Sequence, residues 1–531
     1  MNTAELLHLP VRRLLFVLVL SVMAWTVAAR AQDTQPTSPQ TQTSPPGSPD
    51  KSGTDKSGAQ KSDSDKSDSQ SEEIKITPRQ AEELFHSVDE ILEFDSKFTG
   101  LPIKHTIKRR LTGRDEVVSF LKQSSEEDTQ RLKRSELVLK KFGLLPRNFD
   151  LETFLVSLLR EEVAGYYDPK TKTVNLLDWV PMEEQEPVMA HELTHALQDQ
   201  SVGLKKWMEK GDRDLEKIRR DVTPEDIEYD EMDDAREAVV EGQAQAMMFQ
   251  YAIAPTGHSI TDSPNLVNAM EDETMTGTSS TKVFNEAPIF MKESLTFPYS
   301  YGMEFVLKVL QKGGRQQAFQ GVLKNPPHTT RQIMQPETYL SGEKIEPVRV
   351  PDFKRDFAAY QKFDVGAMGE FDVAVLVEQY AGKELSKEMY PEWRGGYYYA
   401  AKSAQNPSLQ NPGSDASVTG SLALLYVSRW SSADAASEFA GIYAHSLKQR
   451  YNKPVAALGA GEDSHTDAAP EQPDDKPNKI SLLRGRHAWT TEEGTVVIEE
   501  QGDTVLISES IDATTVATLE KKVFGPVAAA K

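Results

Sequence analysis

Hydrophobic positions divide the chain into an apolar N-terminal run, a polar stretch and a long folded region. The polar stretch, residues 32–72, is rich in Pro, Gln, Ser and Thr and then in Asp-Lys-Ser units. It cannot bury enough apolar surface to offset the entropy of ordering it, which predicts a disordered low-complexity linker. Folded structure is predicted from about Ile74, where Thr77 and Pro78 form a helix-start signal. Apolar residues then recur at helical spacing at Ala81, Leu84, Phe85, Val88, Ile91 and Leu92.

The pattern over residues 73–345 is mainly helical with one small β element. Helices are predicted over 115–123, 126–142, 151–162, 184–200, 301–312 and 316–325, with another long helix from Ile227 or Asp233 to about Ala252. A strand is predicted over 103–111. Two β-type runs around an Asp-Pro-Lys-Thr turn predict a hairpin over 163–177. The polar segment 255–286 predicts a long surface loop.

After about residue 346 the composition shifts and predicts a smaller α+β C-terminal domain, residues 346–531. Its predicted elements are helices over 371–380, 433–449 and 513–523 and strands over 420–430, 488–499 and 504–508. An acidic, Pro-rich insert near 459–479 is predicted to be disordered. Trp393, Trp430 and the run from Tyr397 to Tyr399 favour core packing over a ligand surface.

The N-terminal apolar run has the form of a secretory signal peptide. Arg12 and Arg13 precede the apolar residues 14–24, and Ala29-Arg30-Ala31 offers small residues at cleavage spacing. The run is short for a membrane span. We therefore expect residues 1–31 to be removed and the protein to be secreted or periplasmic. An uncleaved anchor is the alternative, and only then is membrane contact expected.

Charge and cysteine content narrow the chemistry. The 531 residues include 60 Lys plus Arg and 82 Asp plus Glu, a net charge of -22, and 38% are hydrophobic. A negative field repels phosphate backbones, so nucleic acid is not an expected partner. There is no cysteine, which excludes disulfides, thiolate metal sites and a thiol nucleophile. Any bound metal must use His, Asp or Glu. Nothing here fixes the oligomeric state.

The central motif is His191-Glu192-Leu193-Thr194-His195 in the predicted helix 184–200. Residues four apart share one helix face, so both imidazoles can meet one cation, and Glu192 can reach a metal-bound water. Zinc in such a site lowers the pKa of that water and polarises a carbonyl, while the carboxylate takes a proton and passes it to the leaving amine. The alternative is a surface helix with two solvated histidines. The surrounding Ala, Leu, Val and Met side chains argue against it.

A third metal ligand is expected from the next long helix. Glu237 and Glu241 lie one turn apart there, and two carboxylates on an apolar face require a cation or protons. We favour Glu241 as the ligand, because Gly242 and Ala244 leave room for the two helices to approach closely. Glu237 is then expected to lie behind it and orient an imidazole, and the reversed assignment stays open.

These motifs resemble the gluzincin clan of zinc metallopeptidases. The segment Glu241-Gly242-Gln243-Ala244 is similar to the Glu-Gly-x-Ala motif whose glutamate binds zinc in aminopeptidase-like members. The segment Glu237-Ala-Val-Val-Glu241 resembles the Glu-x-x-x-Asp arrangement of thermolysin-like enzymes, with Glu in place of Asp. Residues 161–340 also resemble a group of uncharacterised bacterial secreted proteins. The resemblance carries the Gly165-Tyr166-Tyr167-Asp168 hairpin, the Pro-Pro-x-x-Thr stretch and the Pro-Glu-x-Tyr stretch.

The resemblance implies a zincin-like metallopeptidase domain over residues 73–345 with one catalytic Zn²⁺. In gluzincins an extended peptide commonly pairs with the strand before the motif helix, which assigns that role to residues 174–177. A simple packing role for the hairpin is the alternative. A donor to the developing oxyanion is also needed. The candidates are Tyr299, Tyr301, His328 and Tyr339.

The sequence thus predicts hydrolysis of peptide bonds outside the cytoplasm, with a peptide or protein as substrate. Two alternatives remain: a catalytically idle envelope binding or scaffold protein that keeps a structural metal, and a zinc hydrolase of non-peptide amides. The intact Glu192 favours catalysis, because a structural metal site does not require that carboxylate.

Overall fold

A computed structural model describes ten stretches of the chain, and all structural statements below concern these residues. They are 76–114, 116–117, 129–162, 165–180, 182–208, 222–262, 281–403, 419–452, 454–456 and 480–525. The predicted signal peptide (1–31), linker (32–72) and acidic insert (459–479) lie outside them. Most of the predicted helix 115–123 and much of the predicted loop 255–286 do so as well. None of the described helices combines the length and apolar content that crossing a bilayer requires.

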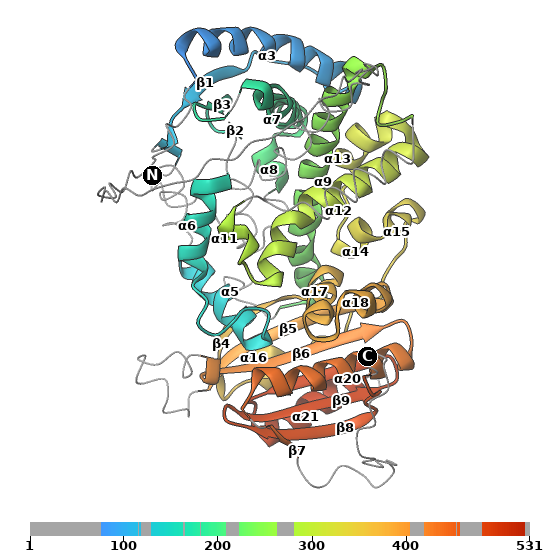
Figure 1. The fold of residues 1–531 in the computed structure, drawn as a ribbon. Coiled ribbons are helices and arrows are strands. Elements are labelled where there is room, and N and C mark those ends of the chain that lie inside the picture. Colours follow the sequence, from blue (N-terminus) through green and yellow to red (C-terminus); the bar gives the residue numbers. More distant parts are fainter. Residues whose placement is uncertain are drawn as a thin grey trace, which may run out of the picture.

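The protein is a mixed α+β structure with two sheets (Figure 1). Long helices and a three-stranded sheet form one end of the molecule, and a seven-stranded sheet forms the other. A single cluster of buried apolar side chains extends from Leu84 in the helical part to Ile507 in the large sheet. The smaller helices, with their bounds, are α5 (Thr129–Phe142), α6 (Leu151–Glu162), α8 (Leu204–Met208), α11 (Lys282–Asn285), α13 (Val322–Lys324), α14 (Thr330–Met334), α15 (Pro336–Ser341), α16 (Phe353–Asp356) and α18 (Lys383–Met389).

The three-stranded sheet contains the predicted hairpin. Strands β2 (Gly165–Asp168) and β3 (Thr173–Leu177) pair antiparallel, and β1 (Lys108–Thr112) pairs parallel with β3. The strand order is β1-β3-β2. The prediction that residues 174–177 form a peptide-binding edge is therefore wrong, because β3 is the central strand and both its edges are paired. The outer strand of the hairpin is β2.

Three long helices form the centre of the helical part. Helix α7 (Met182–Val202) carries the motif and lies between α3 (Pro78–Thr99) and α9 (Pro224–Ile253). On its other side α9 packs against α12 (Ile289–Arg315). Helix α3 begins as predicted, because Thr77 caps it and Pro78 is its first residue. The middle of α7 is buried on every side, as expected for a helix rich in apolar residues all round.

Two glycines bring α9 and α12 into close contact. A Cβ atom added to Gly242 would lie 2.1 Å from the backbone carbonyl of Gly302, and one added to Gly302 would lie 2.2 Å from the carbonyl oxygen of Ala238. We expected Gly242 to let α9 approach the motif helix. That expectation is wrong: Gly242 faces α12, one residue round the helix from Glu241.

A Gly242→Ala protein is expected to be destabilised by about 1–3 kcal/mol, because the added methyl group forces two backbones apart. Chemical denaturation measures the change. Gly113→Ala is a matched control, since its Cβ would lie 3.6 Å from the nearest atom, an ordinary contact. Equal stability of the two variants would show that the α9–α12 crossing relaxes without cost.

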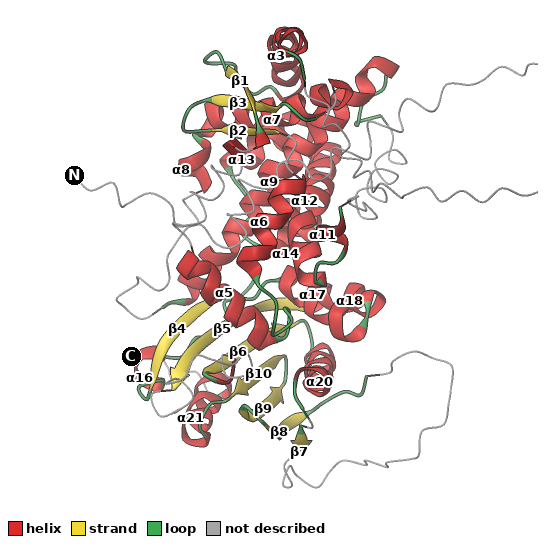
Figure 2. Cartoon of the chain, turned by 60° about the vertical axis from the view of Figure 1, so that its left-hand side comes forward, coloured by secondary structure: helices red, strands yellow, loops and turns green. Residues whose placement is uncertain are grey.

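The seven-stranded sheet is antiparallel throughout, with strand order β4-β5-β6-β10-β9-β8-β7. Its strands are β4 (Tyr360–Ala367), β5 (Trp393–Ser403), β6 (Leu422–Trp430), β7 (Val455–Ala456), β8 (Gly485–Thr491), β9 (Gly494–Gln501) and β10 (Thr504–Glu509). Helices α17 (Glu370–Ala381) and α20 (Ala433–Arg450) contact strands from one side, and α21 (Ala513–Phe524) lies on the other (Figure 2). The predicted strand 488–499 is wrong in one respect: it is two strands, β8 and β9, joined by a tight turn.

Most of the aromatic residues predicted to pack in the core are buried, whereas Tyr398 is partly buried and packs against the core. Trp393, Tyr397, Tyr399 and Trp430 are all buried. Alternate residues of these strands contribute to the two faces, so Tyr397 and Tyr399 pack with Phe353 of α16 while Trp430 stacks on Phe439 of α20.

Candidate metal centre

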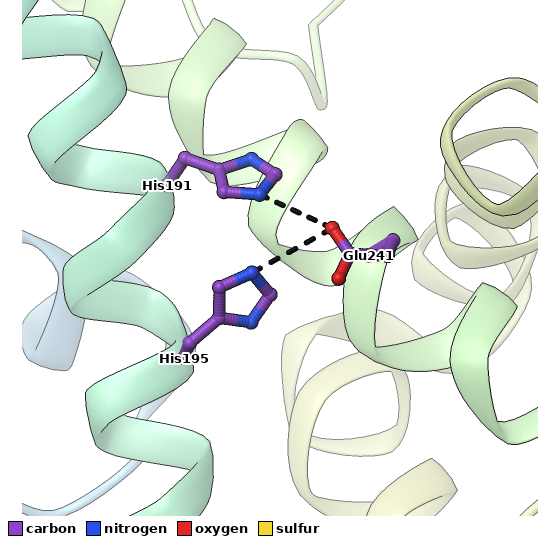
Figure 3. A group of neighbouring side chains, drawn as sticks. All are labelled: His191, His195 and Glu241. Atoms are coloured by element: carbon purple, nitrogen blue, oxygen red, sulfur yellow. Dashed lines mark hydrogen bonds and ion pairs between the residues drawn. The ribbon is translucent and has the colours of Figure 1, made fainter. Parts of the chain in front are cut away.

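The structure brings three predicted residues together between α7 and α9. His191 and His195 project from α7, and Glu241 projects towards them from α9 (Figure 3). The Glu241 Oε2 atom lies 3.2 Å from His191 Nε2 and 3.6 Å from His195 Nε2. Their side chains are only 3%, 3% and 1% exposed. Among the described residues, Glu237 is not part of this group, so Glu241 is the glutamate that the fold places at the imidazoles.

The geometry suits a single metal ion. The three ligand atoms lie within 4.8 Å of one another. Ligand atoms about 2.0–2.1 Å from a tetrahedral ion are about 3.4 Å apart, close to the two separations observed. In addition, Glu241 Oε1 is buried without a hydrogen-bond partner among the described residues. A buried carboxylate that lies between two imidazoles, and that also interacts with the Tyr299 hydroxyl, therefore has the position that a metal ligand needs.

Glu192 lies next to this group but outside it. Its side chain is fully buried, and neither carboxylate oxygen has a hydrogen-bond partner of ordinary geometry in the described part of the chain. Burial raises the pKa of Glu192 to about 8. Strand β2 packs directly on it: a Cβ atom on Gly165 would lie 3.6 Å from Glu192 Cγ and 2.9 Å from Val188. A buried carboxyl group whose charged form is disfavoured by burial is thus held between a possible metal position and the outer strand of the hairpin.

Of the three candidate ligand residues, His195 is the one that carries an additional, ionisable proton in the metal-free protein. Burial alone would lower the pKa of His195, but the charge and hydrogen bond of Glu241 outweigh it and raise that pKa to about 9. Burial lowers the pKa of His191. Burial would raise the pKa of Glu241, yet the charge of His195 and the hydrogen bond from His191 hold it near 2. The metal-free cluster is therefore an ionised Glu241 beside a protonated His195.

Metal binding is expected to displace this proton. Below pH 9 His195 is protonated in the metal-free protein, so the affinity should fall about tenfold for each pH unit below that value and level off above it. Titration calorimetry in two buffers of different ionisation enthalpy counts the protons released. Binding at pH 7 with no proton release would contradict this charge state.

A chain of amide side chains fixes the tautomer of His195. Gln243 Nε2 donates to carbonyl oxygens of the π-helical segment η2 (Gln316–Gly321) at 2.7 and 3.2 Å. Gln198 Nε2 donates to the Val240 carbonyl and to Gln243 Oε1, both at 3.0 Å. Since a carbonyl only accepts, Gln198 Oε1 must accept from His195 Nδ1, 2.9 Å away. The neutral ring then carries its proton on Nδ1 and presents the Nε2 lone pair to the metal position.

A Gln198→Leu protein is expected to bind the metal about 10–100-fold more weakly, the usual cost of removing a group that orients a metal-binding imidazole. Competition with a chelator of known affinity measures the change. Gln198→Glu keeps the acceptor for Nδ1–H and should lose less. If the two variants bind the metal equally, Gln198 acts only through packing.

One of the four candidate oxyanion donors lies at the site. The ring of Tyr299, from α12, stacks on His191 with centroids 6.2 Å apart. Burial raises the pKa of Tyr299, and the carboxylates of Glu241, Glu237 and Glu192 raise it further. Its hydroxyl therefore stays protonated and can donate a hydrogen bond. Glu237 is buried near this hydroxyl and is not the group that orients His195, which is Gln198.

The other three candidates lie elsewhere. Tyr301 packs against Phe297, and the Tyr339 hydroxyl donates to the Asn325 carbonyl at 2.7 Å. His328 lies 3.7 Å from Glu228. Glu228 precedes Glu241 on α9 by about 20 Å, so His328 is far from the candidate metal centre. The sequence alone does not show which of the four candidate donors lies at the site, because the position of each side chain depends on how α12 and the segment after it pack.

Comparison with known proteins adds little to this geometry. No protein-family model matches the chain, and no curated protein matches it. A solved structure that it resembles is the crystal structure of a candidate hydrolase with a novel fold from Chloroflexus aurantiacus. The two share 16% identity over 51% of this chain and 93% of that chain, with a TM-score of 0.34. A likeness of this size carries no argument about the site.

Proposed function

We propose that the protein is a zinc-dependent hydrolase of peptide bonds. The observation that carries the proposal is the buried convergence of His191, His195 and Glu241 beside the buried carboxyl group of Glu192. Two histidines and a glutamate are a catalytic zinc ligand set that leaves a position open for water or substrate. A zinc ion held there would lower the pKa of a bound water and polarise a substrate carbonyl.

The residues of the chain have distinct parts in this reaction. Glu192 accepts the proton of the attacking water at a carboxylate oxygen and passes it to the nitrogen of the leaving amine. Burial raises its pKa, so once ionised it is a stronger base than an exposed glutamate. The Tyr299 hydroxyl, kept protonated by its surroundings, donates a hydrogen bond to the oxygen on which negative charge develops. Gln198 holds the His195 ring in its metal-binding tautomer.

The hairpin supports a peptide as the substrate. Strand β3 is paired on both sides, and of the two edge strands β2 packs against Glu192, so β2 is the strand that an extended peptide would join. Pairing along β2 would lay a backbone amide near the carboxylate and supply main-chain hydrogen bonds. Asp199, near the end of α7, fixes the hairpin by accepting a hydrogen bond of 2.9 Å from Tyr167 and pairing with Lys172.

The same proposal places the protein outside the cytoplasm, with residues 1–31 as the export signal; the apolar run and its small-residue cleavage site support this. The alternative of an idle scaffold with a structural metal predicts the same ligands. It gives no reason for a buried Glu192 beside the ligands, because burying this carboxyl group costs folding free energy that a scaffold does not need to expend.

A peptide-library digest with the purified protein tests the proposal. Cleavage products should appear with the metal present, disappear after chelation and return when zinc is added. Mass spectrometry of the products identifies the bonds cut and separates endopeptidase from exopeptidase action. A metal-loaded protein that cleaves no peptide would support the scaffold alternative.

A further inference from the structure

A cavity of about 490 Å³ lies between the helical part and the seven-stranded sheet. Its walls come from the start of α9, residues 325–332, the first residues of β5 and residues 342–350, which join α15 to α16 and are called the strap below. Its volume is typical of small-molecule sites, roughly 300–1,000 Å³. Glu231 on its wall precedes Glu241 by about 15 Å along α9, so this cavity is separate from the metal centre.

One part of the wall is apolar. Ile227, Val348, Val350 and Tyr397 line the cavity and belong to, or pack against, the hydrophobic cluster on one face of the sheet. Such a surface accommodates a hydrocarbon or aromatic group. The Tyr397 hydroxyl and the indole nitrogen of Trp393, another wall residue, are buried without a hydrogen-bond partner among the described residues. The same wall therefore holds polar groups that the fold does not satisfy.

Two arginines lie side by side on the wall, and they differ in how they are paired. Both terminal nitrogens of Arg331 are paired with carboxylates: Nη1 is 2.9 Å from Glu370 and Nη2 is 3.3 Å from Glu343, while its buried Nε has no hydrogen-bond partner among the described residues. Arg394 donates from Nη1 to the carbonyls of Pro391 and Trp393, both at 2.7 Å. Within the described residues, no carboxylate lies within 4.0 Å of Arg394, and nothing accepts a hydrogen bond from its Nη2 or Nε.

The charge of Arg394 is compensated only in part, by the more distant carboxylates of Glu343, Glu392 and Glu370. Burial, and then the neighbouring charge of Arg331, lower the pKa of Arg394. The side chain is only partly exposed, so water compensates the charge less than on an open surface. A guanidinium edge with two uncommitted N–H groups matches a planar carboxylate, which it can hold with two parallel hydrogen bonds.

We propose that this cavity binds a small monocarboxylate with an apolar or aromatic body, held by the Nη2–Nε edge of Arg394 with its body against Tyr397 and the strap. A single negative charge fits better than a phosphate, because Glu228, Glu231, Glu343 and Glu346 also line the cavity and would repel a second charge. An N-acylated apolar amino acid has this chemistry. The proposal does not depend on the hydrolytic activity.

Titration calorimetry of the full chain with N-acetylphenylalanine tests the proposal, and N-acetylphenylalaninamide serves as the probe without a carboxylate. We expect the acid to bind and the amide to bind at least about tenfold more weakly. Arg394→Gln should weaken the acid by a similar factor. Arg486→Gln, an exposed arginine on β8 of the same sheet, should leave it unchanged. Val348→Trp should fill the cavity and weaken both probes.

Three outcomes would overturn the proposal: no binding of the acid, equal binding of acid and amide, or unchanged binding of the acid by either Arg394→Gln or Val348→Trp. A fourth concerns the metal centre, which also attracts carboxylates. If His195→Ala abolishes binding of the acid, the acid binds there and the cavity proposal fails, while the proposed hydrolase is untouched. If peptides are not cleaved but the Arg394-dependent binding is present, only the proposed function fails.

Discussion

A Glu192→Gln protein is expected to keep its metal and to lose peptide hydrolysis. Glutamine has nearly the same shape, and Glu192 is not one of the three ligand residues, so His191, His195 and Glu241 should stay in place. The amide cannot accept the proton of the attacking water. General-base catalysis contributes about 10²–10⁴-fold, so the rate should fall by at least that factor. Cleavage of a peptide found in the library digest, together with metal content by mass spectrometry, measures both properties.

Glu186→Gln provides the matched control, because Glu186 lies on the same helix but is exposed and hydrogen-bonded to Ser87 and Tyr251. It should leave both rate and metal content unchanged. Cleavage by the metal-loaded Glu192→Gln protein at the original rate would rule out the role given to this carboxylate.

The second large effect is expected at Glu241. Glu241→Gln removes the charged ligand and should weaken metal binding by at least about 100-fold. This effect is larger than that expected from removing a residue that only hydrogen-bonds to a metal ligand. Glu237→Gln should change the affinity by only a few-fold, because Glu237 is not within reach of the two imidazoles. Dialysis against a chelator, followed by metal analysis, compares the two proteins directly.

The pair of variants also decides between the two resemblances found in the sequence. Loss of metal from Glu241→Gln alone agrees with the Glu-Gly-x-Ala arrangement. Loss from Glu237→Gln with retention in Glu241→Gln would support the reversed assignment and would mean that α9 is rotated relative to α7 in solution.

Local signals in the sequence were sufficient for the elements around the site. The hairpin and the motif helix follow from a turn and from apolar spacing, both of which depend on neighbouring residues. The apolar pattern predicts that α9 begins at residue 227 or later. The helix begins at Pro224, where Thr223 and Pro224 repeat the capping signal of Thr77 and Pro78. Pro298 lies inside α12, which begins at Ile289 and not near Tyr301. A proline argues against a helix interior and so conceals the first part of α12.

The division of residues 488–499 into two strands was also missed. Apolar and β-branched residues continue on both sides of Gly494, whose φ of 125° few other residues adopt. The turn itself consists of Glu492 and Glu493 before this glycine, a short interruption in an otherwise strand-like run. The signal is therefore weak until the partner strands are known.

The parts of the site differ in how far the sequence could predict them. His191, Glu192 and His195 are related by the geometry of one helix, and Gln198 completes the same face. The sequence alone gives no reason to assign a role to Gln198, because glutamine is common on helices. Its role follows from its hydrogen bond to Gln243 and from the hydrogen bond of Gln243 to η2. Tyr299 reaches the site through the crossing of α9 and α12. That crossing depends on Gly242 and Gly302, residues far apart in the chain.

The wide spacing of the candidate ligands along the chain affects how strongly a bound metal ion would stabilise the folded protein. His191 and Glu241 are 50 positions apart, so an ion bound between them acts as a cross-link that closes a long loop. Such a link disfavours the unfolded chain, and its contribution grows with the supply of free ion. A newly synthesised chain would gain its full resistance to unfolding and proteolysis only once it has acquired metal.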